Sequence, residues 1–285
     1  MAGNSGEAGG RSVAGRVFAV LEAFDGERES LRLAEIARQA GLPAPTALRM
    51  VRELVAWGAL ERQRDGGYRL GRRLWALGSL APCLRRVREL AQPALRDLHE
   101  RTGQTALVAA LDGRSALLLD RLPGAAAPSS PFRVRVGGRM DLHATAVGRV
   151  LLAHAPEALV REVTAGLSAA GARHTRDTVV APGRLARELA AVRRGGVGYA
   201  RREMQPVYGA AAVPVFHPDG SLLAALGLVV AAPVDPARFE ARLREAGRLM
   251  TAGVARSVAE EAGQAGQATG SAKGTEGTDR ARSTG

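Results

Sequence analysis

The sequence is poor in cysteine, lysine and aromatic residues. Cys83 is its only cysteine, all but one of its 40 basic residues are arginine, and aromatic residues make up 4% of the 285 positions. A single cysteine excludes an internal disulfide framework and a structural zinc site built from several cysteines. The scarcity of aromatic residues argues against a protein that binds single-stranded nucleic acid by stacking its bases.

Long hydrophobic runs are absent as well. The longest nearly uncharged apolar run, residues 222–234, is shorter than the roughly 20 residues that a membrane helix needs. The glycine-rich start contains no apolar segment typical of a secretory signal, so we expect a cytoplasmic protein that makes no contact with a membrane. Residues 1–11 and 263–285 are rich in small and polar residues and are expected to be disordered. The length predicts two domains between them.

The positive charge of the chain is unevenly spread. The net charge of +12 suggests a nucleic-acid partner, although an arginine bias can also reflect genome composition. Residues 13–41 hold four arginines against five acids, whereas residues 45–73 hold seven arginines against three acids. A basic stretch beside a neutral one is what a phosphate-facing surface requires. Because the rest of the chain is also basic, charge alone does not identify the partner.

The N-terminal part has the pattern of a winged helix-turn-helix. Apolar residues recur at helical spacing over residues 13–25, 33–40 and 44–57, and Gly41-Leu42-Pro43 separates the second helix from the third. Two short extended pieces, residues 60–63 and 68–70, flank the turn sequence Arg64-Asp65-Gly66-Gly67. A short turn between two helices directs the second of them into the major groove of DNA.

The outward residues of this pattern are candidates for contact with DNA. Arginine suits guanine or a phosphate because its guanidinium donates two parallel hydrogen bonds. Alternatively, the arginines form a solvated helix face and the small helical domain mediates protein contacts. The candidate DNA-binding residues are Thr46, Arg49 and Arg52 on the third helix and Arg62, Arg64 and Arg69 on the hairpin.

The remainder of the chain alternates between helical and extended patterns. We expect an α+β domain with an antiparallel sheet, in which Asp112-Gly113 and Pro218-Asp219-Gly220 are turns. Residues 70–84 are expected to form a linker helix whose apolar side can pair with a second subunit. The expected helices are residues 85–101, 143–154, 185–194 and 239–262, and the expected strands are residues 105–111, 116–122, 132–136, 210–216 and 222–230.

No catalytic or metal-binding pattern is present in the sequence. The five histidines are scattered without metal-ligand spacing, and neither a nucleophile elbow nor a nucleotide-binding glycine loop occurs. His143 is interpreted as a residue that orders the turn before its helix, and Cys83 as inert packing in the linker. We therefore predict no enzyme activity, no cofactor and no metal.

Several ordered motifs resemble the IclR family of bacterial transcriptional regulators. They are the sequence LAEIARQAGLP at residues 33–43, GYRLG at residues 67–71, DLHATAVGR at residues 141–149, LARELAAVRRGG at residues 185–196, and the later positions Glu203, Ala212, Pro214, Val215, Asp219 and Gly220. Each motif alone is weak, but together and in this order they are specific, and the resemblance covers about residues 12–262.

The resemblance implies a winged helix-turn-helix DNA-binding domain at residues 12–71, a linker helix at 72–84 and a GAF-like α/β effector-binding domain at 85–262. It also implies a homodimer or homotetramer that reads a palindromic operator in double-stranded DNA. A small effector would bind in the cup of the sheet. The effector-binding positions carried over are Ala146, Val147, Ala200, Glu203, Ala210, Gly227 and Val229.

Two departures from the family pattern bear on the effector. Gly227-Leu228-Val229 replaces a pair of serines, so a compact carboxylate would lose hydrogen-bond donors. We therefore expect a larger, apolar or aromatic effector, with Arg201, Arg202 or Tyr208 as its polar anchor. The alternative is that the pocket is filled by its own side chains and senses nothing. On the DNA side, Pro45 replaces a serine, which removes one hydroxyl contact.

The sequence thus favours a sequence-specific transcriptional regulator that is controlled by an effector. Of the two directions of regulation, it favours a repressor over an activator. An enzyme that acts on a small metabolite and uses its N-terminal domain for assembly is the alternative. A protein that coats DNA without sequence preference is a third interpretation, because of the high isoelectric point.

Overall fold

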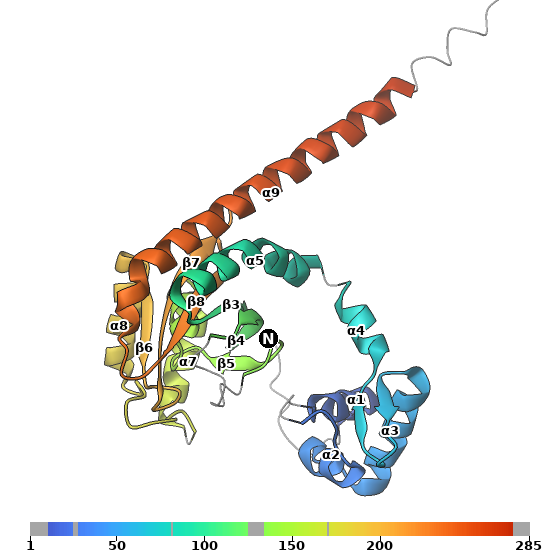
Figure 1. Cartoon of the computed structure of the whole chain (residues 1–285). Coiled ribbons are helices and arrows are strands. Elements are labelled where there is room, and N and C mark those ends of the chain that lie inside the picture. The colour runs from blue at the N-terminus through green and yellow to red at the C-terminus, as the bar shows by residue number, and fades with distance from the viewer. Residues whose placement is uncertain (1–10, 25–27, 81, 125–133, 170, 276–285) are drawn as a thin grey trace, which may run out of the picture. The chain divides into compact units, whose positions relative to one another are not determined.

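The computed structural model describes residues 11–24, 28–80, 82–124, 134–169 and 171–275, without the side chains of residues 82–84 and 264–275. The chain divides into two compact units, residues 1–85 and residues 86–285. Each unit is described by itself below, and Figure 1 labels their elements.

The N-terminal unit is the expected winged helix-turn-helix. Its third helix ends at Gly58, which has a left-handed backbone. The turn of the hairpin contains Gly66 with φ of 84°, and its ends are joined by a hydrogen bond of 2.8 Å from the Gln63 amide to the Gly67 carbonyl. The elements are α1 (Val13–Glu22), α2 (Leu33–Ala40), α3 (Ala44–Trp57), β1 (Leu60–Arg62), β2 (Tyr68–Leu70) and α4 (Arg72–Gly78).

A small core fixes α3 against the other two helices. Met50, Val51 and Leu54 bury the inner side of α3, together with Val20 of α1 and Ile36 of α2. Sequence reasoning identified most of this stripe but missed Met50. It also missed an isolated bridge between residues 31 and 68, which ties the segment before α2 to the hairpin by hydrogen bonds of 2.8 and 2.9 Å.

Gly41 forms the turn between α2 and α3. Its φ is 62°, and the Gly41 amide donates to the Arg38 carbonyl at 3.2 Å while the Leu42 amide donates to the Ala37 carbonyl at 2.9 Å. This arrangement closes α2 and sets the direction of α3.

Replacing Gly41 by alanine is expected to destabilise the N-terminal unit by about 1–2 kcal/mol, which is the cost of a left-handed backbone for an L-residue. A Cβ atom at this position meets no atom within 4 Å, so the cost is conformational. Thermal unfolding followed by tryptophan fluorescence measures it, because both tryptophans, Trp57 and Trp75, lie in this unit. Gly41→Asn should lose less stability. An alanine variant as stable as the wild type would show that this turn is not held in the left-handed conformation.

The expected linker helix is wrong in one respect. Instead of one helix over residues 72–84, α4 ends at Gly78 and α5 (Pro82–Thr102) begins at Pro82. Proline is favoured at the first position of a helix, which is where α5 has Pro82. The prediction for Cys83 falls on a side chain outside the described residues.

The C-terminal unit is built on one antiparallel sheet. Two hairpins, β3–β4 and β7–β8, are joined through β3 and β8, and β5 and β6 form the edges. The strands are β3 (Thr105–Asp112), β4 (Ser115–Leu122), β5 (Arg139–Asp141), β6 (Gly198–Arg201), β7 (Tyr208–Phe216) and β8 (Leu222–Ala231).

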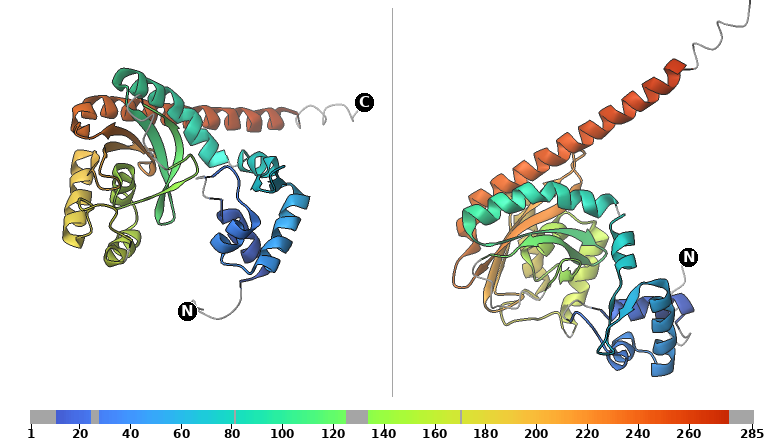
Figure 2. Two further views of the ribbon diagram at one scale, coloured as in Figure 1. Left: turned by 60° about the horizontal axis from the view of Figure 1, so that its bottom comes forward. Right: turned by 45° about the vertical axis from the view of Figure 1, so that its right-hand side comes forward.

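Helices cover the sheet on both faces. In Figures 1 and 2, α5 and α9 (Glu240–Thr275) cross the same face, and the Arg86 side chain of α5 donates to the Ser257 carbonyl of α9 at 2.9 Å. The other face carries α6 (Ala146–Ala153), α7 (Glu157–Ala165) and α8 (Pro182–Gly195). The main core lies between this second layer and the sheet.

Two features of the unit differ from the sequence prediction. The strand expected at residues 132–136 is not formed at residues 134–136, because the glycines that follow make a turn and place the strand at Arg139–Asp141. Phe132 and Arg133 lie outside the described residues. The last helix continues to residue 275 instead of ending near 262, although residues 263–275 include four glycines, which disfavour a helix.

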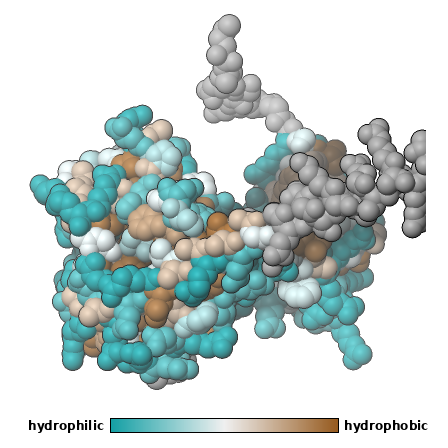
Figure 3. All heavy atoms as spheres, turned by 90° about the horizontal axis from the view of Figure 1, so that it is seen from above, coloured by the Kyte–Doolittle hydropathy of each residue, from teal (hydrophilic) through white to brown (hydrophobic). Residues whose placement is uncertain are grey.

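The visible face in Figure 3 is mainly hydrophilic, with hydrophobic residues scattered among charged ones. Within the described residues, no helix is long and apolar enough to cross a membrane.

Candidate functional site

The outward side of α3 leaves the candidate DNA-binding residues open to solvent. Arg49 and Arg52 are exposed and Thr46 is half-buried, while Ala47 and Met50 turn into the core. Among the described residues, neither arginine has a hydrogen bond or an ion pair. Two guanidinium groups near the N-terminal half of one helix are therefore available to an external partner.

The hairpin presents three further arginines, which differ in their contacts. Arg62 and Arg64 are exposed and have no ion-pair partner in the described parts of the chain. Arg69 pairs with Glu61 across the two strands, with 2.7 Å between its Nη2 atom and Oε2. Hydrogen bonds from the Arg69 side chain, and then from the Arg72 amide, lower the pKa of Glu61. The charge of Arg69 is thus partly neutralised by Glu61, whereas Arg62 and Arg64 can form ion pairs with an external partner.

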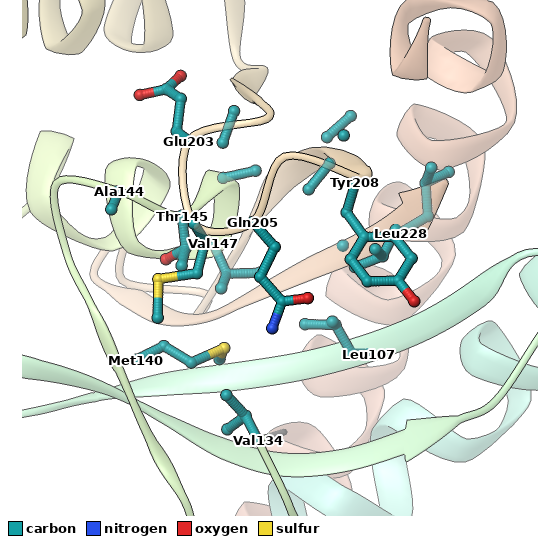
Figure 4. A pocket seen from close by; sticks show the side chains of 18 residues that line it. Leu107, Val134, Met140, Ala144, Thr145, Val147, Glu203, Gln205, Tyr208 and Leu228 are labelled. Atoms are coloured by element: carbon teal, nitrogen blue, oxygen red, sulfur yellow. The ribbon is translucent and has the colours of Figure 1, made fainter. Parts of the chain in front are cut away.

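The C-terminal unit contains a cavity of about 150 Å³ between the sheet and α6. Figure 4 shows its lining from β3, β5, β7, β8, the start of α6 and the segment after β6. All seven candidate effector-binding residues lie on its wall. The complete lining is Leu107, Val134, Met140, Ala144, Thr145, Ala146, Val147, Ala200, Glu203, Met204, Gln205, Tyr208, Gly209, Ala210, Ala211, Gly227, Leu228 and Val229.

The lining is apolar apart from four side chains, and none of the four is a cation. The Thr145 hydroxyl donates to the Asp141 carbonyl at 2.7 Å and accepts from the Gly148 amide at 3.1 Å, which caps α6. Gln205 also has an interaction partner. The Tyr208 hydroxyl is buried without any hydrogen-bond partner in the described part of the protein. The remaining polar residue is Glu203.

Glu203 forms a buried ion pair with Arg149 of α6. Their side chains are 6% and 2% exposed. Arg149 Nη1 donates to Glu203 Oε1 at 2.9 Å, Nη2 donates to Oε2, and Nε donates to the His143 carbonyl at 3.0 Å. The Glu203 carboxylate also accepts from the Val179 amide at 3.2 Å. In Figure 4 this carboxylate points away from the cavity. Glu203 therefore shapes the wall while its charge is neutralised behind it.

The packing around Gly227 leaves no room for the side chain of a serine at this position. A Cβ atom there would lie 2.9 Å from Val147 Cγ1 and 3.1 Å from the Ala211 carbonyl oxygen. β8 therefore approaches α6 too closely for a side chain at this position. The apolar lining at this end of the cavity is a consequence of that packing.

Two of the three suggested polar anchors lie elsewhere. Arg201 pairs with Asp235 at 3.1 Å, and Arg202 pairs with Asp177 at 3.3 Å. Neither arginine lines the cavity, which leaves Tyr208 of the three. His143 has structural contacts, since its Nε2 lies 2.7 Å from the Ala172 carbonyl oxygen.

Sequence reasoning found the small residues of the wall through their motifs and missed the large ones. Leu107, Met140 and Leu228 lie on strands whose alternation marks them only as core residues. Met204 and Gln205 belong to an irregular segment without a periodic signal. In the described residues, no group of three or more histidine, cysteine or acidic side chains could hold a metal ion.

Comparison with known proteins gives matches over both units. The family model for the IclR helix-turn-helix domain matches residues 13–64, and the model for the bacterial transcriptional regulator IclR C-terminal domain matches residues 84–256.

Named relatives and solved structures agree with these matches. The chain is 30% identical over 237 residues to the HTH-type transcriptional regulator XynR of Escherichia coli, covering 81% of this chain and 92% of that protein. It is 28% identical to the transcriptional repressor IclR of Escherichia coli, covering 65% and 67%. The crystal structure of an IclR homologue from Microbacterium hydrocarbonoxydans complexed with 4-hydroxybenzoate superposes with a TM-score of 0.77 at 35% identity, covering 85% of this chain and 99% of that one.

Proposed function

The chain belongs to the IclR family of bacterial transcriptional regulators, and from this premise we propose that it is a repressor whose binding to an operator is controlled by a single-ring aromatic effector. We propose no catalytic step and no cofactor for this protein. Binding to bacterial DNA places this activity in the cytoplasm.

The observation that carries the DNA-binding part is the outward side of α3. Thr46, Arg49 and Arg52 occupy the part of the helix that enters the major groove in a helix-turn-helix protein. Arg49 and Arg52 have no internal partner among the described residues. We assign Arg62 and Arg64 to the neighbouring phosphates, with a smaller contribution from Arg69 because of its pair with Glu61.

We further propose a homodimer or homotetramer, since a palindromic operator requires two recognition helices. Exposed apolar residues on and after α4 support pairing with a second copy: Trp75 is 77% exposed and Leu80 is 73% exposed. Leu77 is also exposed, whereas Leu74 packs against the N-terminal core. Leu84, the last residue of the predicted apolar side, has its side chain outside the described part.

The cavity in the C-terminal unit supports an aromatic effector. An apolar cavity of about 150 Å³ accommodates one benzene ring. Its wall consists almost entirely of aliphatic side chains and glycine, which suits the faces of a ring. The relative solved with 4-hydroxybenzoate supports the same class of ligand. An effector controls DNA binding only by as much as its affinities for the two states of the protein differ.

A panel of single-ring aromatic compounds tests the effector. A ligand at 100 times its Kd should add about 2.7 kcal/mol to the stability of the unit that binds it, or roughly 5–10 °C in melting temperature. Ala210→Ile, which extends a side chain from β7 into the cavity, should abolish the shift. Leu249→Ile, a change on the exposed side of α9, is the matched control and should keep it. If the shift persists in Ala210→Ile, the ligand binds elsewhere and the proposed pocket is wrong.

A further inference from the structure

The C-terminal unit contains a second, polar pocket of about 250 Å³, called the arginine pocket below. Its floor is the buried pair of Arg149 and Glu203, whose carboxylate points away from the effector cavity in Figure 4. Its rim carries charged side chains from three segments, namely the turn before α8, the first half of α8 and the end of β6. The charged rim residues are Arg176, Asp177, Arg184, Glu188, Arg201 and Arg202.

The positive charge of the rim is only partly neutralised within the protein. Arg176 and Arg202 approach the same carboxylate, that of Asp177, with N–O distances of 3.9 and 3.3 Å. The Arg184 side chain has neither an ion pair nor a hydrogen bond among the described residues, and the same holds for Glu188. Four arginines of the rim thus face two acids across the hollow, which leaves an excess of positive charge for a ligand.

The fourth rim arginine, Arg201, is placed by an aromatic ring. Its guanidinium carbon lies 4.7 Å from the centre of the Tyr199 ring, and the Tyr199 hydroxyl donates to Glu240. Arg201 also pairs with Asp235 outside the pocket, but both side chains are about half exposed. Exposed ion pairs are weak, so a ligand with more than one negative charge can replace Asp235 as the partner of Arg201.

Arg202 is held in a backbone conformation that arginine rarely adopts. Its φ is 58°, and no other residue than glycine has a positive φ in the described part of the chain. Hydrogen bonds fix it on both sides, because the Arg202 amide donates to the Tyr208 carbonyl at 2.8 Å and its carbonyl accepts from the Thr175 hydroxyl at 2.7 Å. Residues strained in this way cluster at binding sites. An arginine at a position that suits glycine or asparagine better therefore indicates a use for its side chain.

We propose that the arginine pocket binds a small anion with more than one negative charge, of the phosphate class, such as a phosphorylated metabolite. Guanidinium groups pair with phosphate oxygens through two parallel hydrogen bonds. A hollow of about 250 Å³ encloses a small ligand, whereas the backbone of a DNA duplex requires an open surface. The site is separate from the effector cavity and does not depend on the identity of the effector, although Glu203 borders both hollows.

Calorimetric titration of the full-length protein with pyrophosphate, at an ionic strength held constant with chloride, tests the proposal. The wild type should show saturable binding, and Arg184→Ala should weaken it at least about tenfold, which corresponds to about 1.4 kcal/mol. Arg202→Asn should weaken it by a similar factor. The ligand-free Arg202→Asn protein should melt at the wild-type temperature or above it, because asparagine tolerates the left-handed backbone better than arginine. A purely structural role for the Arg202 side chain predicts a lower melting temperature instead.

Arg187→Ala is the matched control for Arg184→Ala. Arg187 is exposed on the same helix, has no partner among the described residues and does not line the pocket, so this variant should bind pyrophosphate like the wild type. Equal weakening by the two variants would show general attraction by the net charge and overturn the site, as would the absence of saturable binding by the wild type. If Arg184→Ala also weakens the binding of DNA duplexes, the pocket contacts DNA and the proposal is wrong.

Discussion

Replacing Arg149 by methionine is expected to lower the free energy of unfolding of the C-terminal unit by about 3–5 kcal/mol, since the variant leaves one charge of a buried pair uncompensated. Arg149 donates to both oxygens of Glu203 and to the carbonyls of His143 and Tyr199, the last at 2.5 Å. All of these acceptors lose Arg149 at once, and the Glu203 carboxylate keeps only hydrogen bonds from backbone amides, such as that of Val179.

Two further variants distinguish the effect of an uncompensated buried charge from the effect of losing any arginine. Arg149→Met/Glu203→Leu should recover much of the loss, because no buried charge remains. Arg161→Met removes an exposed pair with Glu157 on α7 and should cost at most about 0.5 kcal/mol. Calorimetry of the full chain measures the unfolding of the C-terminal unit, and tryptophan fluorescence monitors the N-terminal unit as an internal control. A single Arg149→Met variant as stable as the wild type would refute this role of the pair.

Replacing Arg49 by alanine is expected to remove most of the preference for the operator over unrelated DNA. A bidentate contact between arginine and a base discriminates by about 1–3 kcal/mol in each half-site, and a two-fold symmetric complex loses it twice. Because Arg49 is exposed and has no partner among the described residues, the folding of the unit should be unchanged.

Arg64→Ala on the hairpin is the matched control for Arg49→Ala. A phosphate contact carries no sequence information, so this variant should weaken binding to all duplexes alike and reduce the dependence on salt. Fluorescence anisotropy with operator and scrambled duplexes at several salt concentrations distinguishes the two effects. If Arg49→Ala leaves the ratio of the two affinities unchanged, α3 does not read bases through this residue.

Local signals explain why the N-terminal unit could be predicted from the sequence. The turn at Gly41, the end of α3 at Gly58 and the hairpin around Gly66 depend on backbone conformations that few residues other than glycine adopt. The spacing of apolar residues then gave the buried side of α3. The interruption at Pro82 has an equally local signal, which the apolar spacing of the linker concealed.

The effector site could be predicted only in part, because its contacts join distant segments. Motif positions indicated the small residues of the wall, such as Ala146 and Gly227. The pairing of Arg149 with Glu203, 54 residues later, leaves no pattern in a single sequence. The depth of Tyr208 depends on how an irregular segment enters β7, which propensities do not determine. The polar and apolar character of the cavity wall could therefore be determined only from the structure.

Footprinting of the full-length protein on the DNA around its own gene, at physiological salt and with or without 4-hydroxybenzoate, decides whether this chain is an effector-controlled regulator. We expect a protected pseudo-palindrome with half-sites about one helical turn apart, and an occupancy that changes when the ligand is added. Ala210→Ile should protect the same site without responding to the ligand. Absence of any protected site, or protection of unrelated DNA to the same extent, would refute the proposed function.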